Sequence, residues 1–355
     1  MTNLQKMQSL LCGDVSALLL TAQVSRQYAA RYDVHEGVAV IGKERCFYFT
    51  DSRYIEVAQE NLPDFCVKEM NRNNRYPDLI NAALEELGAN TLGIEEEYLT
   101  YGEYLYYEKN LKAELVPYQK EISSFRQTKE PWEIDCMKKA QAITDLAFSE
   151  ICKILKPGMT EKEAATELIY CLLKNGSEGL AFDPIVVSGP NSSKPHGVPS
   201  ERKMQHGDFV TMDFGAKVGG YCADMTRTVA LSYATEEMEM IYAIVLKAQE
   251  AAIAATKEGA TGAEVDGVAR KIIDDAGYGE YFGHGYGHSV GLEVHEDPNC
   301  SPGNTKPLTA GVVCSAEPGI YLPGKFGVRI EDVVIVTADG CEDITASPKK
   351  LMIIS

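Results

Sequence analysis

Apolar and polar positions alternate in short blocks over residues 1 to about 120. Two apolar runs, GVAVIG and CFYFTD, have the length and composition of strands joined as a hairpin. The run YPDLINAALEELG places its apolar residues at helical spacing, which indicates an amphipathic helix. Strands mixed with helices predict an α/β domain. Between the second strand and the next helix, Asp51-Ser52-Arg53-Tyr54 is interpreted as a helix cap with a surface ion pair.

The spacing changes near residue 129, where a long stripe of helical period begins. Its members are Ile134, Met137, Ala140, Ile143, Ala147, Ile151 and Ile154. Pro131 suits the first turn of this helix, because a proline there removes no helical hydrogen bond. We therefore predict a first domain over residues 1–122, a linker over 123–128 and a second domain over 129–355.

The second domain contains an internal repeat. KPGMTEKEAATELIYCLLKNG, starting at 156, and KEGATGAEVDGVARKIIDDAG, starting at 257, share the pattern Lys-x-Gly-x-Thr-x-x-Glu. A Thr followed three residues later by Glu is a capping box, which starts a helix. Since a long helix ends before each copy, the repeat predicts a helix-turn-helix unit that occurs twice.

The strands after each helix pair correspond as well. HGDFVTMDFG aligns with AGVVCSAEPG, and the second half has a slightly longer turn after this strand. The alignment matches four acids in two pairs, Asp213 with Glu317 and Asp224 with Glu331. PHGVP likewise matches VHEDP, which pairs His196 with His295. Each half therefore offers two acids and one histidine.

The four acids share one face of their strands, because side chains alternate with a period of two. Opposite them lie Met212, Ala316, Val328 and Ile330. We expect helices to cover the acid face, and buried carboxylates repel one another unless cations lie among them. Arg227 and Arg329 are the evident basic residues on these strands, and two single charges cannot balance four. The pattern therefore predicts a pair of divalent metal ions.

Histidines add to this acid set. FGHGYGHSVGLEVHEDP contains His284, His288 and His295, three of the six histidines in the chain. Glycines around His288 allow the close backbone approach of a ligand loop. An imidazole ligand among carboxylates favours manganese, cobalt or zinc over magnesium or calcium. Two such ions lower the pKa of a shared water and polarise a carbonyl, while a glutamate ligand accepts the proton, so we expect hydrolysis.

Composition limits the partners. The net charge of −18 and pI near 4.8 argue against nucleic acid or an anionic membrane and favour a peptide or another small substrate. Ten cysteines without a CxxC pair predict free thiols in a reducing cytoplasm. The first apolar run, between Lys6 and Asp14, is too interrupted for a secretory signal, and no stretch reaches the ~18 apolar residues of a membrane span.

The elements HGYGHSVGLEVHE, EPGIY and RIED are together specific, and with them the chain resembles the pita-bread metallopeptidases that include aminopeptidase P, prolidase and methionine aminopeptidase. Residues 129–355 resemble the catalytic domain, and the first 120 residues, with TDSRYIEVA, resemble the smaller N-terminal domain of aminopeptidase P and prolidase. The resemblance implies an α/β (α+β) fold, in which a creatinase-type N-terminal domain precedes a pita-bread catalytic domain with an internal pseudo-twofold repeat.

The resemblance also implies a role for each candidate residue. Asp213 would bind one metal ion, Asp224 and Glu331 would bridge both, and His288 with Glu317 would hold the second. Glu317 would act as general base, and His196 and His295 would face the substrate. His284, Tyr321 and Arg329 would lie beside the site and orient its groups. The implied cofactor is two divalent ions, with manganese ahead of cobalt or zinc.

The implied activity is that of a cytoplasmic, homodimeric exopeptidase that acts before proline, either an Xaa-Pro aminopeptidase or an Xaa-Pro dipeptidase. One alternative is a methionine-aminopeptidase-like or broader aminopeptidase, against which the additional N-terminal domain argues. Another is a catalytically silent peptide-binding protein on the same scaffold, against which the complete ligand set argues. Phe182 is a candidate wall for the proline, and an ordinary core position is an equal alternative.

Overall fold

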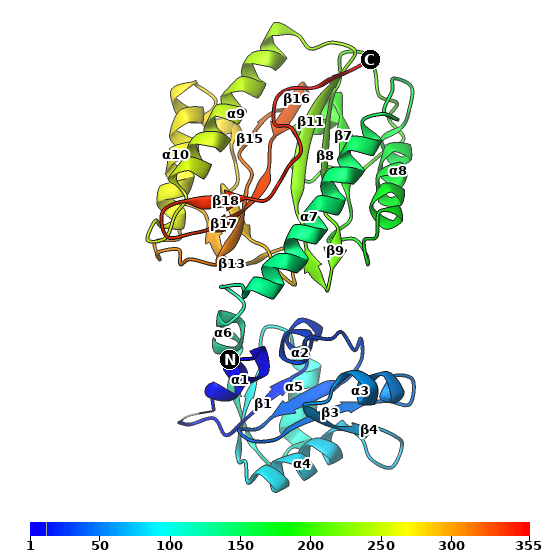
Figure 1. The fold of residues 1–355 in the computed structure, drawn as a ribbon, viewed down its shortest axis with the longest axis vertical. Helices are drawn as coiled ribbons and strands as arrows, with labels where there is room; N and C mark the ends of the chain where they lie inside the picture. The colour runs from blue at the N-terminus through cyan, green and yellow to red at the C-terminus, as the bar shows by residue number, and fades with distance from the viewer. Residues whose placement is uncertain (12) are drawn as a thin grey trace. The chain divides into compact units, whose positions relative to one another are not determined.

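The computed structural model describes residues 1–11 and 13–355, which form two compact units, Met1–Arg126 and Gln127–Ser355 (Figure 1). The first unit is a mixed sheet in the order β4-β3-β2-β1-β5-β6 with helices around it. Its strands are β1 Ala17–Leu20, β2 Val38–Ile41, β3 Cys46–Thr50, β4 Phe65–Glu69, β5 Thr91–Ile94 and β6 Glu114–Pro117. Its helices are α1 Asn3–Ser9, α2 Gln23–Ala30, α3 Ile55–Asn61, α4 Tyr76–Leu87, α5 Tyr101–Asn110 and α6 Gln119–Ser124.

The predicted elements of the first unit are present. Strands β2 and β3 pair antiparallel as a hairpin, and α4 ends at Gly88, which adopts φ 63° as its C-cap. The surface ion pair is confirmed, since Arg53 Nη2 lies 2.7 Å from Asp51 Oδ2. The helix cap is wrong, because α3 starts after Tyr54, whose side chain makes no capping hydrogen bond.

The second unit contains four main helices among the described residues, α7 Pro131–Ile151, α8 Glu161–Lys174, α9 Glu236–Ala255 and α10 Gly262–Asp275. Its first sheet has the order β19-β11-β8-β7, and its second has the order β13-β12-β14-β17-β18. The strands are β7 Ile185–Ser188, β8 Phe209–Phe214, β9 Lys217–Val218, β10 Tyr221–Cys222, β11 Met225–Leu231, β12 Gly287–Ser289, β13 Glu296–Cys300, β14 Val313–Ala316, β15 Gly319–Leu322, β16 Phe326–Arg329, β17 Asp332–Val336, β18 Cys341–Asp343 and β19 Ile353–Ile354. Two 3-10 turns are η1 Gly189–Ser193 and η2 Gly279–Tyr281.

The internal repeat is confirmed in three dimensions. Thr160 and Thr261 each accept a hydrogen bond from the backbone N–H of the Glu three residues later, which closes the predicted capping boxes of α8 and α10. The two halves then continue into β8 and β14, each followed by a hairpin, β9–β10 in the first half and β15–β16 in the second. The longer second hairpin accounts for the longer turn that the alignment required.

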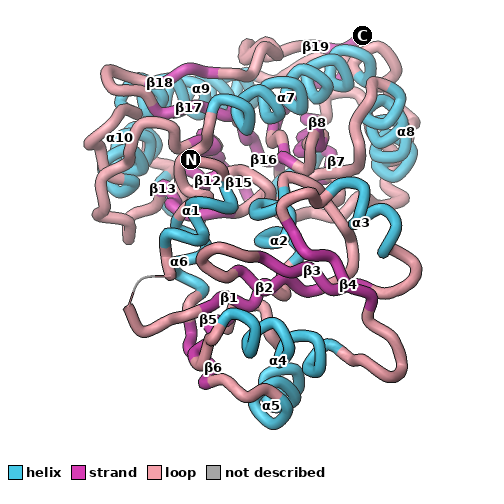
Figure 2. Tube along the Cα trace, turned by 60° about the horizontal axis from the view of Figure 1, so that its bottom comes forward, coloured by secondary structure: helices cyan, strands magenta, loops and turns pink. Residues whose placement is uncertain are grey.

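The helices cover the apolar face of the sheets and leave the acid face open. Met212 of β8 packs in one core with residues of α7 and α8, and Ala316 and Val328 pack in another with residues of α9 and α10. Figure 2 shows α7 and α9 along the same side of β8 and β16. The expectation that helices cover the acid face is therefore wrong. The apolar face offers the helices area to bury, whereas the acids would leave them with uncompensated charge.

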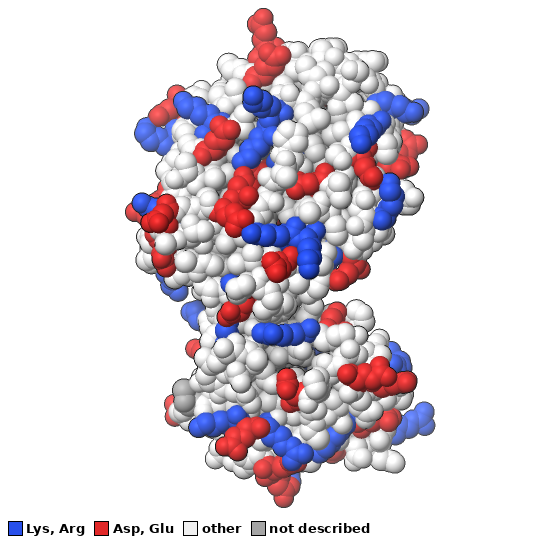
Figure 3. Space-filling view, viewed as in Figure 1, with Lys and Arg blue, Asp and Glu red and all other residues white. Residues whose placement is uncertain are grey.

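Charged side chains of both signs are mixed on the visible surface (Figure 3). On the face drawn in Figure 3, lysine and arginine are interspersed with aspartate and glutamate rather than gathered into one basic area. Across residues 1–11 and 13–355, no helix has both the length and the apolar character that crossing a bilayer requires.

Candidate metal centre and active site

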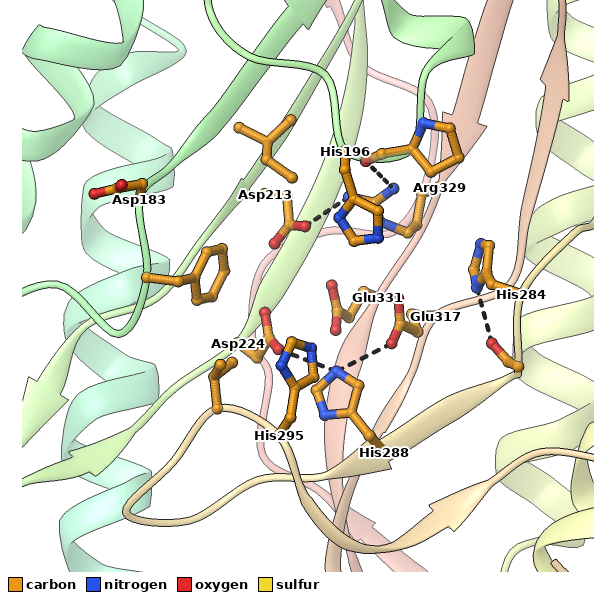
Figure 4. Close-up of a pocket in the computed structure, with 15 residues that line it drawn as sticks. Asp183, His196, Asp213, Asp224, His284, His288, His295, Glu317, Arg329 and Glu331 are labelled. Atoms are coloured by element: carbon orange, nitrogen blue, oxygen red, sulfur yellow. Dashed lines mark hydrogen bonds and ion pairs between the residues drawn. The ribbon is translucent and has the colours of Figure 1, made fainter. Parts of the chain in front are cut away.

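A cavity of about 390 Å³ opens on the acid face of the second unit (Figure 4). Its lining contains the acids Asp183, Asp213, Asp224, Glu317 and Glu331, the histidines His196, His284, His288 and His295, and Arg329. Phe182, Ile185, Pro195 and Val294 supply apolar wall. Every predicted site residue except Tyr321 therefore borders this one cavity, and Phe182 lies in its wall.

The acids lie at or near the ends of strands in both halves of the internal repeat. Asp213 lies near the end of β8, in register with Thr226 of β11 and Ile185 of β7. Asp224 immediately precedes β11, Glu317 immediately follows β14, and Glu331 lies between β16 and β17. The pseudo-equivalent positions of the repeat thus meet across the cavity.

Three of these side chains form a tight group. One ligand atom each from Asp224, His288 and Glu331 lies within 4.8 Å of the others. His288 Nδ1 is 3.1 Å from the carbonyl oxygen of Ser289, which directs Nε2 at the carboxylates. Nε2 is 3.2 Å from Glu317 Oε1 and 3.7 Å from Asp224 Oδ2. An imidazole fixed through one nitrogen with the other facing oxygen ligands is an arrangement typical of metal ligands.

The carboxyl groups are strongly perturbed. Burial, followed by the charges of neighbouring acids, raises the pKa of Asp224 and of Glu331 well above their ordinary values. Burial also raises the pKa of Asp213, although Arg329 opposes the shift. Burial and the charges of neighbouring acids both disfavour the ionised form of these carboxyl groups. The acids therefore need a cation nearby in order to ionise together.

Glu317 responds in the opposite direction. Burial alone would raise the pKa of this carboxyl, but the hydrogen bond and charge of His288 outweigh it and lower the pKa to about 2. The same pairing raises the pKa of His288 despite its burial. Glu317 is therefore the acid of this group that stays ionised most readily.

The donor set fits divalent metal ions. Oδ1 of Asp213 is buried and has no hydrogen-bond partner among the described residues, while Oδ2 is 2.6 Å from Arg329 Nη2. A buried carboxylate oxygen without a partner is costly unless a cation binds it. Oxygen ligands with one imidazole suit manganese, cobalt or zinc, as the sequence predicts.

A hydrogen-bonded chain backs the acids. Arg329 Nη1 donates to the Tyr321 hydroxyl at 2.9 Å and to the carbonyl of Pro195 at 3.2 Å. His284 Nε2 lies 2.9 Å from the same hydroxyl, and its Nδ1 lies 2.8 Å from the Gly285 carbonyl. Burial lowers the pKa of His284, so a neutral ring accepts from Tyr321 while Nδ1 donates. Tyr321 therefore stands behind the cavity wall and joins Arg329 to His284.

His196 and His295 lie at the rim of the cavity. Both residues are exposed, and the ring of His295 lies 4.3 Å from that of His288, tilted by 67°. Burial of the ring and the charge of His288 lower the pKa of His295, which favours a neutral imidazole. Figure 4 shows His196 beside Asp213 and Arg329. These positions leave both rings able to reach a bound substrate.

Two hydroxyl residues support the acids, and the sequence pattern placed them on the acid face without predicting a role for either. Thr226 Oγ1 donates to Glu331 Oε2 at 2.7 Å and accepts from Arg329 Nε at 2.9 Å. Ser315 Oγ donates to Glu317 Oε1 at 3.1 Å and accepts from the backbone N–H of His288 at 3.0 Å. The period-two pattern, which places both on the acid face, is the signal that could have found them.

Arg227, one of the two basic residues considered on these strands, does not face the acids. Alternation turns it to the face opposite Thr226, where it is 1% exposed and pairs with Asp332 at 2.7 Å. Its Nη1 donates to the carbonyl oxygens of Thr226 and Glu331 at 3.0 and 2.6 Å. Arg227 therefore holds the backbone of the two halves together, while Arg329 contacts the acids.

Comparison with known proteins finds a family match for each of the two units. Residues 135–338 match Metallopeptidase family M24, and residues 4–128 match the Creatinase/Prolidase N-terminal domain. A curated Xaa-Pro dipeptidase of Pyrococcus horikoshii is 39% identical over 319 residues, which span 89% of this chain and 88% of that protein.

Solved structures give the same result. An Xaa-Pro dipeptidase from Bacillus anthracis has 40% sequence identity and a TM-score of 0.95 over 99% of each chain. An X-Pro aminopeptidase from Thermotoga maritima has 37% identity and a TM-score of 0.92 over 98% of this chain and 99% of that one. The predicted pita-bread fold with a creatinase-type N-terminal domain is confirmed, and the family implies divalent metal ions. The chain belongs to metallopeptidase family M24.

Proposed function

We propose that this protein is a dinuclear metallo-exopeptidase that hydrolyses the bond between an N-terminal residue and proline. The observation that carries the proposal is the convergence of acids from both halves of the repeat, together with His288, on one cavity. The relatives named as Xaa-Pro dipeptidases and as an X-Pro aminopeptidase support the choice of substrate.

We assign Asp213 to one metal ion, His288 and Glu317 to the other, and Asp224 and Glu331 to positions between the two. Divalent ions held there would polarise the scissile carbonyl and lower the pKa of water. Manganese is the proposed native ion, with cobalt or zinc as substitutes. Metal analysis of protein purified without added metal, followed by reconstitution with each ion, tests this assignment.

The remaining steps are assigned to side chains of the chain itself. Glu317, with its low pKa, accepts a proton from the attacking water. His196 and His295 at the cavity rim stabilise the developing oxyanion and supply a proton to the leaving nitrogen. The apolar wall of Phe182, Ile185, Pro195 and Val294 receives the proline ring, which has no N–H to satisfy once it is bonded in a peptide.

Substrate comparison tests the proposal. The reconstituted enzyme is assayed on Gly-Pro, on a longer peptide that begins Xaa-Pro, and on a peptide that begins Met-Ala. The proposal expects turnover of one or both proline substrates and little of the third, and the ratio of the first two separates dipeptidase from aminopeptidase. Preference for Met-Ala would instead support the methionine-aminopeptidase alternative, and metal binding without turnover would support a silent binding protein.

We also propose a homodimer in the cytoplasm, as the family resemblance implies. Light scattering coupled to size-exclusion chromatography measures the oligomer, and a monomeric mass at micromolar concentration contradicts the dimer. Cell fractionation tests the compartment.

A further inference from the structure

Glu161, the first residue of α8, is a buried acid that the proposed mechanism does not use. Its side chain is fully buried, at 0% exposure. Oε1 accepts from the backbone N–H and the hydroxyl of Ser188 at 2.7 and 2.8 Å. Oε2 accepts from the same two groups of Ser200 at 3.0 and 2.6 Å. Asn191 Nδ2 reaches both oxygens at 3.2 Å. One carboxylate therefore holds two segments that lie twelve positions apart in the chain.

The segment between these contacts is the loop that carries His196. It leaves β7 at Ser188, passes through η1, and returns to Glu161 at Ser200. Its middle is anchored on β16, where the backbone N–H of Gly327 donates to Ser192 Oγ at 2.9 Å and Arg329 donates to the carbonyl of Pro195. His196 follows Pro195 directly, so both ends and the middle of the loop are fixed around an exposed imidazole.

In the second half of the repeat, the position equivalent to Glu161 is occupied by a glycine. Gly262 is the first residue of α10 and corresponds to Glu161 in the alignment of the capping boxes. A Cβ at Gly262 would meet the Asn299 carbonyl oxygen at 2.4 Å and Asn304 Nδ2 at 2.9 Å. The chain that follows His295 therefore packs its own backbone against the start of α10, where no carboxylate fits. Glu161 therefore has no acidic counterpart at the equivalent position of the second half.

We propose that Glu161 is a positioning residue that sets the location of His196 over the metal centre. Its two oxygens fix the span of the loop, and Arg329, which also contacts Asp213, fixes the residue before the histidine. The imidazole is thereby held relative to the acids by a contact outside the cavity. The inference rests on the proposed role of His196 at the substrate.

Four variants test this role. Glu161→Gln keeps the shape of the side chain but replaces one acceptor oxygen with a donor that faces the serine donors, so the loop ends separate. Ser200→Ala removes one of the hydroxyl contacts and is the milder form, in case the first variant folds poorly. Glu163→Gln is the matched control, because Glu163 is on the same turn of α8 but is exposed, and its side chain hydrogen-bonds Thr160 in the capping box. His196→Ala removes the imidazole itself.

Metal content, and kcat and KM on an Xaa-Pro substrate, are measured for each of the four variants. The same measurements are made on the double variant that combines Glu161→Gln with His196→Ala. We expect Glu161→Gln to lower kcat on the order of tenfold or more with metal content unchanged, since displacing a catalytic group by about 1 Å can cost about 100-fold. Glu163→Gln should keep the parent kcat. In the double variant, Glu161→Gln should add less than about twofold to the loss caused by His196→Ala, because both act through one group.

The possible results distinguish failure of the positioning role of Glu161 from failure of the proposed peptidase function. If the two losses multiply, or if Glu161→Gln and Ser200→Ala both keep the parent kcat, Glu161 does not act through His196 and the inference is overturned while the peptidase proposal stands. If His196→Ala alone leaves kcat unchanged, the substrate-facing role of His196 fails, and the positioning role fails with it. Loss of metal in Glu161→Gln would also overturn it, because a loop effect leaves the ligands in place.

Discussion

At the level of single residues, the centre is defined by acids that line one cavity together with His288 and Arg329. Asp224 has the most exacting position, because it contacts His288 and shares a ligand group with Glu331. Replacing it with Asn removes a charge that both proposed metal positions use. We expect Asp224→Asn to lose bound metal and at least about 100-fold in kcat, as measured by elemental analysis and steady-state kinetics. Near-normal activity would show that the bridging assignment is wrong.

His295 tests the difference between a ligand and a group that faces the substrate. It lies against the ring of His288 but is exposed at the cavity rim. We expect His295→Ala to lower kcat by about 10- to 1,000-fold while the metal content stays near that of the parent. Parallel loss of metal and activity would make His295 a ligand.

Residue type and spacing identified most of the candidate site from sequence. Acids and histidines stand out because they are costly to bury, and their repetition in the two halves marks them together. The contributions of Thr226, Ser315 and the Pro195 carbonyl could not be read in the same way. A hydroxyl or a backbone carbonyl is satisfied in most settings, and its role depends on which strand lies opposite. Because side chains alternate along a strand, the sequence alone could have placed Arg329 on the acid face and Arg227 on the opposite face.

At the level of elements, short glycine-bearing strands bring the ligands close. Gly287 in β12 lies directly against β14, since a Cβ there would meet the Ser315 carbonyl oxygen at 2.2 Å. Gly287→Ala must therefore displace β12, which carries His288. We expect a loss of roughly 1–3 kcal/mol in the free energy of unfolding, and weaker metal binding.

The control for this variant is Gly283→Ala. A Cβ at Gly283 meets nothing within 4 Å, although the residue belongs to the same histidine segment. Denaturant unfolding and metal titration of the two variants compare them directly, and equal stabilities would contradict the close approach of β12 to β14.

The helices were the elements that the sequence predicted best. The sheet face that they cover was the feature that it predicted worst. Capping boxes and apolar stripes are local signals, so the starts of α8 and α10 follow from the sequence. Helix α7 ends at Ile151, so Ile154 of the predicted stripe lies beyond it. Which face of a sheet the helices cover is decided by the tertiary packing of whole layers. The sequence separated the two faces correctly, and the apolar one attracted the helices.

At the level of the whole molecule, stability is coupled to metal and pH. The raised pKa values of Asp224, Glu331 and His288 favour folding of the metal-free protein at acidic pH, and this contribution is lost as pH rises through those values. Glu317, with a pKa of about 2, contributes its stability above the ordinary pKa of a glutamate and loses it only in strong acid. Between about pH 5.5 and 8, the raised pKa values of Asp224, Glu331 and His288 make the metal-free protein less stable as pH rises, whereas the lowered pKa values of His284 and His295 act in the opposite direction.

Divalent ions bound by Asp224, Glu331 and His288 would take the place of the protons that these groups release. We expect manganese to raise the Tm of chelator-treated protein more at about pH 8 than at about pH 5.5, as measured by differential scanning fluorimetry at constant free metal. The increment should shrink in Asp224→Asn at both pH values. An increment independent of pH would mean that the acids are already ionised without metal.

The doubled architecture has a consequence for folding of the centre. Asp213 and Asp224 belong to one half of the second unit, while His288, Glu317 and Glu331 belong to the other. Neither half alone carries the full proposed ligand set, so the centre can form only when both copies of the repeat have folded and packed against each other.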